Sequence, residues 1–172
     1  MAVPTRHGLD GKSWLQGKWL NRLRRPWLRR RRPPVRYTLF GGCCCSIEMI
    51  PLLTDRYRPD EYDIRPARSV DEADTLVVAG PVTEKNAPLI REVYDLMPQP
   101  RWVVAFSACS CGGGPYHQGA TVLDGVDTLI PVDVYVPGNP PRPEALIHAL
   151  LAVQQLKAQG RQIDAIDRNP YQ

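Results

Sequence analysis

The stretch Val35-Arg-Tyr-Thr-Leu-Phe-Gly-Gly-Cys-Cys-Cys-Ser46 indicates how this chain folds. Its first six residues alternate in character and include β-branched and aromatic side chains, which is typical of a strand. Two glycines, which permit close approach of the backbone, then precede three consecutive cysteines, Cys43, Cys44 and Cys45. The sequence therefore predicts a strand that presents thiols at its carboxyl end.

Further strands and helices alternate along the rest of the sequence. Residues 75–79 and 102–106 are short apolar runs of the kind that forms buried parallel strands, and residues 128–136 predict a last strand. Residues 87–97 and 143–159 carry apolar side chains at helical spacing. This alternation predicts an α/β fold, an open and mainly parallel sheet flanked by helices.

Ligands in open α/β folds bind outside the edge where the carboxyl ends of the strands meet. The third predicted strand is followed by Cys109 in a glycine-rich loop, so the sequence places Cys109 on the same edge as Cys44 and Cys45. Adjacent cysteines cannot readily form a disulfide with each other, so the pattern favours metal or redox chemistry. A free cysteine also packs well as a small apolar group, which is the interpretation favoured for Cys43 and an equal alternative for Cys111.

Several separate motifs occur in order within residues 37–159. They are Gly42-Cys-Cys-Cys-Ser-Ile-Glu-Met49, Ala73-Asp-Thr-Leu-Val-Val-Ala-Gly-Pro-Val-Thr83, Val93-Tyr-Asp-Leu-Met-Pro-Gln-Pro-Arg-Trp102, Ala108-Cys109 and Ile130-Pro-Val-Asp-Val-Tyr-Val-Pro-Gly-Asn-Pro-Pro-Arg-Pro-Glu144. Together they are similar to the small iron–sulfur subunit of respiratory complex I (NADH:quinone oxidoreductase), the 20 kDa type. They also resemble its counterpart in membrane-bound, energy-converting nickel–iron hydrogenases. The resemblance implies a flavodoxin-like fold that holds a [4Fe–4S] cluster.

In that family the cluster is bound by a Cys-Cys pair, by a cysteine after the central strand and by a cysteine in a Pro-Gly-Cys-Pro-Pro loop. The first three positions fall on Cys44, Cys45 and Cys109, but Asn139 stands at the fourth. An amide is a poor substitute for a thiolate in iron–sulfur ligation. Cys111, two residues beyond Cys109, is therefore the predicted fourth ligand. The cluster is expected either in an altered form or lost.

The resemblance implies an electron-transfer subunit of a membrane-associated oxidoreductase that passes electrons to quinone or to a nickel–iron centre. The expected partners are membrane subunits and a large catalytic subunit of the complex I 49 kDa or hydrogenase large-subunit type. The sequence contains no Ser-His-Asp set, no HExxH and no phosphate-binding glycine pattern, so we interpret the chain as a relay and not a complete catalyst. Glu48 and His117 are interpreted as ordinary polar residues. Two alternatives are a structural subunit that has lost its cluster and a docking module whose thiols only pack.

A basic arm precedes the predicted α/β domain. Eleven of the 22 Lys and Arg but one of the 18 Asp and Glu fall in residues 1–36, a net charge of +10 that leaves −6 for the rest of a chain whose overall charge is +4. Trp and Leu recur in this arm at helical spacing, which suits an anionic membrane interface. The alternatives are docking on a partner subunit and a solvated tail. Nucleic-acid binding is not expected, because no recognition fold follows the arginines.

These features divide the sequence into a basic arm (1–36), an iron–sulfur α/β domain (37–159) and a polar tail (160–172). A hydrophobic content of 43% suffices for a core. No signal peptide or run of about 18 apolar residues occurs. Five cysteines without disulfide spacing favour a reducing compartment. We therefore expect a peripheral protein on the cytoplasmic face of a membrane.

Overall fold

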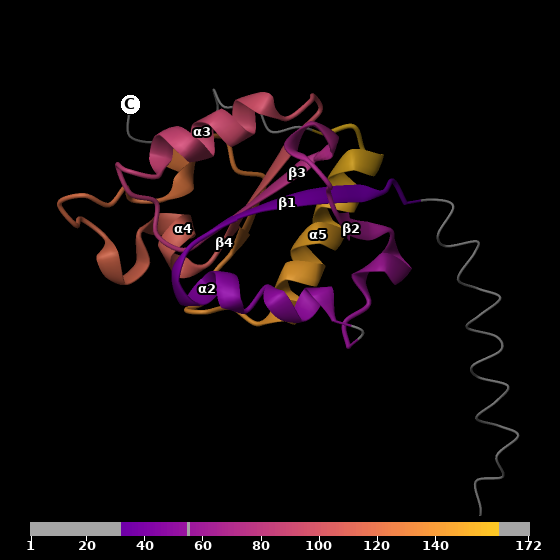
Figure 1. Ribbon diagram of the computed structural model, residues 1–172, viewed down its shortest axis with the longest axis horizontal. Coiled ribbons are helices and arrows are strands. Elements are labelled where there is room, and N and C mark those ends of the chain that lie inside the picture. The colour runs from indigo at the N-terminus through magenta and orange to yellow at the C-terminus, as the bar shows by residue number, and fades with distance from the viewer. Residues whose placement is uncertain (1–31, 55, 162–172) are drawn as a thin grey trace, which may run out of the picture. The chain divides into compact units, whose positions relative to one another are not determined.

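Five parallel strands form the centre of the fold (Figure 1). The structure, a computed structural model, describes residues 32–54 and 56–161. Within them the strands lie in the order β2-β1-β3-β4-β5, and every pairing is parallel. The strands are β1 (Val35–Gly41), β2 (Ile64–Pro66), β3 (Thr75–Ala79), β4 (Trp102–Phe106) and β5 (Val134–Val136). The predicted open parallel sheet is confirmed. Residues 1–31 of the basic arm and residues 162–172 of the polar tail lie outside the described residues. The last two residues of the predicted arm, Val35 and Arg36, already belong to β1.

Helices cover both faces of the sheet. α3 (Ala87–Leu96) lies on one face, and α5 (Pro143–Ala158) lies on the other together with the short α2 (Cys43–Ile47) (Figure 1). Another short helix, α4 (Ala108–Gly112), follows β4. The helices predicted over residues 87–97 and 143–159 are thus confirmed. No helix in the described part of the chain is both long and apolar enough to cross a membrane.

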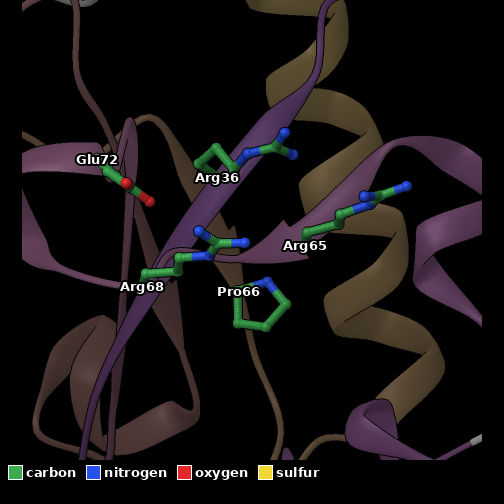
Figure 2. A pocket seen from close by; sticks show the side chains of 5 residues that line it. All are labelled: Arg36, Arg65, Pro66, Arg68 and Glu72. Atoms are coloured by element: carbon green, nitrogen blue, oxygen red, sulfur yellow. The ribbon is translucent and has the colours of Figure 1, made fainter.

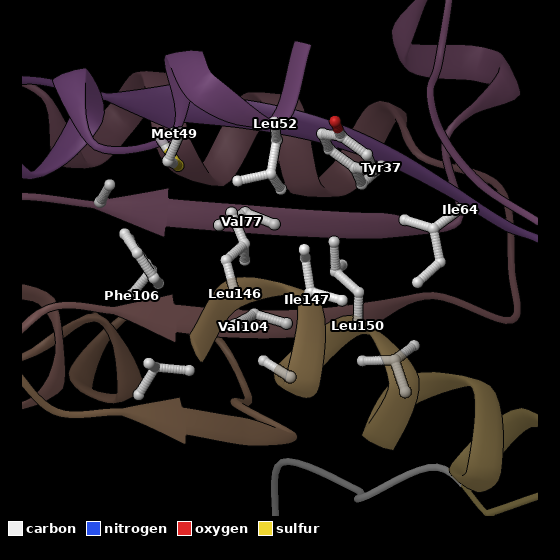
Figure 3. Close-up of a cluster of buried hydrophobic side chains, with 14 of the residues drawn as sticks. Tyr37, Met49, Leu52, Ile64, Val77, Val104, Phe106, Leu146, Ile147 and Leu150 are labelled. Carbon is white, nitrogen blue, oxygen red and sulfur yellow. The ribbon is translucent and has the colours of Figure 1, made fainter. Parts of the chain in front are cut away.

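Alternate side chains of the central strands β3 and β4 enter two different cores. On β3, Val77 faces the first core, which it shares with Leu150 of α5 (Figure 3). Val78 on the same strand faces the second core, which it shares with Ile90 of α3. All five residues of β3 are buried, as expected for a central parallel strand covered by helices on both faces.

The last strand is shorter than predicted. β5 begins at Val134, because Val126–Thr128 forms a 3-10 turn and Pro131 has no N–H to donate to a neighbouring strand. The Asp133 carboxylate accepts a hydrogen bond from the Val103 N–H at 2.8 Å, and regular pairing of β4 with β5 starts one residue later. The prediction of a strand from residue 128 is therefore wrong over its first six residues, and only Val134–Val136 are confirmed.

Two further elements were not evident from the sequence. The predicted glycine-rich loop after β4 starts as a helix, so Cys109 lies in α4. β2 is an edge strand of three residues, too short for a hydrophobic period to be recognised. Additional 3-10 turns span Ile50–Leu53, Pro59–Tyr62, Val70–Glu72 and Gly114–Tyr116.

The first core supports a stability prediction. Leu150 is fully buried, so Leu150→Ala leaves a cavity and is expected to lower the free energy of unfolding by about 2–5 kcal/mol. The matched control is Leu96→Ala on α3, because the Leu96 side chain is 62% exposed; its effect should stay within about 0.5 kcal/mol. Urea unfolding followed by circular dichroism measures both. Equal losses in the two variants would contradict this packing of α5 on the sheet.

Candidate functional site

Three consecutive thiols emerge where β1 ends. The Cys43 and Cys44 sulfurs are 3.8 Å apart, and the Cys44 and Cys45 sulfurs are 3.9 Å apart. Cys43 and Cys44 are exposed, whereas Cys45 is buried and belongs to the first core. Cys43 has a φ of 67°, in the left-handed region that favours glycine. The start of α2 thus turns one thiol inward and leaves two at the surface.

Glycines let the ends of β1 and β3 touch. The Gly42 N–H donates a hydrogen bond to the Ala79 carbonyl at 3.2 Å. Gly80 has a φ of +88°, and a Cβ atom placed on it would lie 2.4 Å from the Gly42 carbonyl oxygen. The Gly80 N–H also donates to the Ser107 hydroxyl at 3.2 Å, just beyond the end of β4. Residue 80 therefore ties together the two segments that carry the cysteines.

Cys109 faces the thiols of α2. It lies in the first turn of α4, which the Ser107 hydroxyl caps by accepting a hydrogen bond from the Ser110 N–H at 3.1 Å. Burial raises the pKa of the Cys109 thiol, and the neighbouring Cys43 and Cys44 raise it further, while a hydrogen bond with the Cys45 side chain lowers it. A raised pKa favours the protonated thiol, and metal binding requires the thiolate, so binding at Cys109 releases a proton.

Cys111 lies apart from this group. Its thiol donates a hydrogen bond to the Ala105 carbonyl at 3.4 Å and packs against the second core. Burial is the main cause of its raised pKa, and the Asp127 carboxylate adds to the increase. The structure therefore brings Cys44, Cys45 and Cys109 together, and it does not bring Cys111 among them. It also adds Cys43, for which packing was the favoured interpretation. Spacing alone gave no signal for this difference.

The proline-rich loop lies against α4. The Ala108 N–H donates to the Gly138 carbonyl at 2.7 Å, and the Ser107 N–H donates to the Val136 carbonyl at 3.0 Å. Asn139 follows directly and is exposed. Asn139 thus lies in the loop where the family resemblance implies a thiol, one residue after the backbone contact with α4.

Glu48 and His117, which were interpreted as ordinary polar residues, lie in polar surroundings. The backbone of Glu48 caps the end of α2, and its side chain is partly exposed. His117 is exposed, and its Nδ1 atom lies 3.0 Å from the Asp124 carboxylate. Neither of them adds to the thiol group.

The side chains at this edge that could bind a metal are thiols. In the described ranges, no three His, Cys, Asp or Glu side chains are close enough to hold one metal ion. Soft thiolates are the usual ligands of iron–sulfur clusters. Four free thiols lie at this edge of the sheet, two of them buried and two exposed, so the donors present are of the type that such clusters use.

An apolar surface adjoins the thiols. Ile47, Ile50 and Leu53 follow the cysteines along α2 and the next 3-10 turn, and they are 62%, 57% and 65% exposed. Several large apolar side chains exposed together are typical of a protein interface. Apolar side chains open to solvent therefore lie next to the thiols in the sequence.

Comparison with known proteins gives the family. The model described as "NADH ubiquinone oxidoreductase, 20 Kd subunit" matches residues 43–153. The B-type subunit of NADH-quinone oxidoreductase from Clostridium beijerinckii is 47% identical over 117 residues, 67% of this chain and 69% of the relative. The corresponding subunit from Roseiflexus castenholzii is 44% identical over 151 residues (87% and 54%), and that from Salinispora tropica is 50% identical over 125 residues (70% and 66%). The chain belongs to this 20 kDa subunit family, and it spans between 54% and 69% of the length of these relatives.

Solved structures agree with the fold. A chain of the membrane-bound sulfane sulfur reductase, an archaeal respiratory membrane complex, is 32% identical with a TM-score of 0.69, over 79% of this chain and 77% of that chain. A chain of an NAD+-reducing [NiFe]-hydrogenase in the H2-reduced state is 19% identical with a TM-score of 0.53, over 81% and 97%. The second similarity shows a shared fold alone. Both neighbours carry the α/β architecture described above.

Proposed function

We propose that this chain is an electron-transfer subunit that holds a [4Fe–4S] cluster in a membrane-associated, complex I-like oxidoreductase. The observation that carries the proposal is the gathering of Cys44, Cys45 and Cys109 with Cys43 at the carboxyl edge of the sheet. Such a cluster supplies one-electron transfer when it is bound. The family match and the relatives named as NADH-quinone oxidoreductase subunits support this assignment.

The protein's contribution is ligation, burial and exclusion of water. Cys45 and Cys109 would hold the buried side of the group, since both are nearly inaccessible to solvent. Cys44 would hold the outer side, where it is exposed. Ligand type, burial and hydrogen bonds to sulfur set reduction potentials across about −700 to +450 mV. The side chains around these thiols are therefore the means by which the chain selects its potential.

Two thiols compete for the fourth ligand position. The sequence prediction is Cys111, whose thiol would have to leave the second core and its hydrogen bond to Ala105. Cys43 needs no such change, because its sulfur lies 3.8 Å from that of Cys44 and it is among the neighbours that raise the pKa of Cys109. The geometry favours Cys43.

The apolar surface is the proposed docking site for a partner subunit. Ile47, Ile50 and Leu53 would dock on a large catalytic subunit of the complex I 49 kDa or hydrogenase large-subunit type, since desolvated apolar side chains form the centre of such interfaces. Docking there would bring the thiol group close to quinone or to a nickel–iron centre held by the partner. The identities of 44–50% to the quinone oxidoreductase subunits support quinone.

One observation favours a second function. Asn139 replaces the cysteine of the family loop, so the chain would also suit a structural role in a related complex without a cluster. Iron analysis separates the two functions.

The complex purified without oxygen exposure is expected to contain about four irons per chain. The reduced protein should give an electron paramagnetic resonance signal, which Cys44→Ser, Cys45→Ser and Cys109→Ser each remove or alter because each takes away a thiolate ligand. Circular dichroism checks that the variants fold. An iron-free wild-type protein would instead support the structural role.

The fourth ligand is tested by a matched pair of substitutions. Cys43→Ser should lose iron or convert the spectrum to a three-iron form, whereas Cys111→Ser should retain both the iron content and the spectrum. Asn139→Ala should be neutral, and adding Asn139→Cys to Cys43→Ser should restore the iron by returning a thiolate to the loop. Loss in Cys111→Ser alone would assign the ligand to Cys111. Full retention in both variants would mean that three cysteines suffice.

We also propose that the arm of residues 1–36 docks the chain on the cytoplasmic face of a membrane. Each basic residue near an anionic surface contributes about 1 kcal/mol. Replacing Arg29, Arg30, Arg31 and Arg32 with glutamine keeps the tryptophans and should weaken vesicle binding by about a thousandfold at low salt. Flotation with anionic vesicles at rising salt measures this, and deletion of residues 1–32 serves as the limiting case. Unchanged vesicle binding in both variants would exclude the arm as the membrane anchor.

A further inference from the structure

A second surface suited to binding lies at the other end of the strands. This surface is a pocket of about 440 Å³, the Arg36 pocket, which is lined by Arg36, Arg65, Pro66, Arg68 and Glu72 (Figure 2). Arg36 is the second residue of β1, whereas the cysteines follow the last residue of that strand. The pocket is therefore separate from the thiol group and from the function proposed for it.

Two of these arginines lie side by side on neighbouring strands. Arg36 of β1 pairs in register with Arg65 of β2. The preceding pair, Val35 and Ile64, lies in the first core, so both arginine side chains point to the opposite face of the sheet. Like charges directly opposite each other destabilise a sheet. Arg68 adds a third positive charge just after β2.

A nearby carboxylate that could relieve this repulsion is engaged elsewhere. Asp74 accepts a hydrogen bond from the Arg36 backbone N–H at 3.1 Å, from the Thr75 hydroxyl at 2.7 Å and from the Lys157 ammonium at 2.7 Å. Within residues 32–54 and 56–161, no side chain forms an ion pair or hydrogen bond with the three guanidinium groups of the pocket. Their donors are free for a ligand.

We propose that the Arg36 pocket binds a phosphate monoester dianion. Three arginines and the Glu72 carboxylate give the pocket a net charge of +2, which matches the charge of about −1.5 to −2 on a phosphate monoester at pH 7. A single carboxylate ligand would leave the pocket positive. Guanidinium groups donate paired N–H bonds that fit phosphate oxygens. A bound phosphate also removes the repulsion between Arg36 and Arg65.

The same dianion can come from two sources. One is free phosphate or a soluble phosphate ester, and the other is the headgroup of a lipid such as phosphatidic acid. Common phosphodiester lipids carry only one negative charge on phosphate, so they match the pocket less well. The experiment therefore has two parts, called the soluble arm and the vesicle arm of the test: one with a soluble phosphate and one with lipid vesicles.

The full chain and two double variants are compared. Arg65→Gln with Arg68→Gln removes two donors of the pocket, and Lys85→Gln with Arg91→Gln removes the same charge from exposed positions near and on α3. In the soluble arm, equilibrium dialysis measures binding of inorganic phosphate at low salt. We expect about tenfold weaker binding for each guanidinium lost, or about a hundredfold in the pocket variant, and less than about twofold in the control. Wild-type binding should also weaken from pH 7.5 to 5.5, since the second phosphate pKa is about 6.

The vesicle arm measures flotation with phosphatidic acid vesicles and with phosphatidylglycerol vesicles of equal surface charge. If the wild-type chain prefers phosphatidic acid vesicles, the pocket variant does not, and neither binds inorganic phosphate, the source is the lipid. If the wild-type chain binds inorganic phosphate, the source is the soluble phosphate. Arg36→Lys, which keeps the charge but not the paired donors, should give an intermediate loss in either arm. Equal losses in the pocket and control variants overturn the proposal, as does a wild-type chain that binds neither probe. Pocket-dependent binding of a polyglutamate peptide in place of phosphate also overturns it, in favour of an acidic protein segment.

Discussion

The contact between the Gly42 and Gly80 backbones is the constraint on which the thiol group depends. β3 lies between β1 and β4 in the sheet, so the cysteines of α2 and α4 face each other across its end. A Cβ atom at residue 80 would lie 2.4 Å from the Gly42 carbonyl oxygen and force the end of β1 away. The bond from the Gly80 N–H to Ser107 then fixes the start of α4 at the same place. One residue without a side chain thus sets the distance between the two sources of ligands.

The buried Cys45 connects the thiol group to the hydrophobic core. Cys45 belongs both to the thiol group and to the first core, which the residues of α5 complete. Because unfolding would destroy such a site, any metal held there adds its binding free energy to the stability of the sheet. The exposed Ile47 and Leu53 lie on the other side of the same short segment. Core, thiols and apolar surface therefore succeed one another within a dozen residues of sequence.

The sequence predicted the strands and helices that follow from hydrophobic periodicity. It did not predict which cysteines face one another, because that depends on how each short helix is rotated about its axis. Residues 75–79 and 102–106 are apolar throughout because both faces of a central parallel strand are covered, and their recognition placed Cys109 on the edge of Cys44 and Cys45. Within a short helix, however, neighbouring residues point in directions about 100° apart. Whether Cys43 or Cys111 faces the group depends on where α2 and α4 begin, which no spacing rule gives. β2 escaped prediction because three residues carry too little pattern.

The composition of β2 also bears on how this chain avoids self-association. An edge strand offers unpaired N–H and C=O groups to any other strand that approaches, and long apolar edges lead to aggregation. β2 is only three residues long, carries the charged Arg65, and ends at Pro66, which has no N–H to donate. A second copy would therefore meet a short, positively charged edge with a missing donor. Another strand therefore cannot readily extend the sheet from the β2 side, which limits association of two copies through that edge.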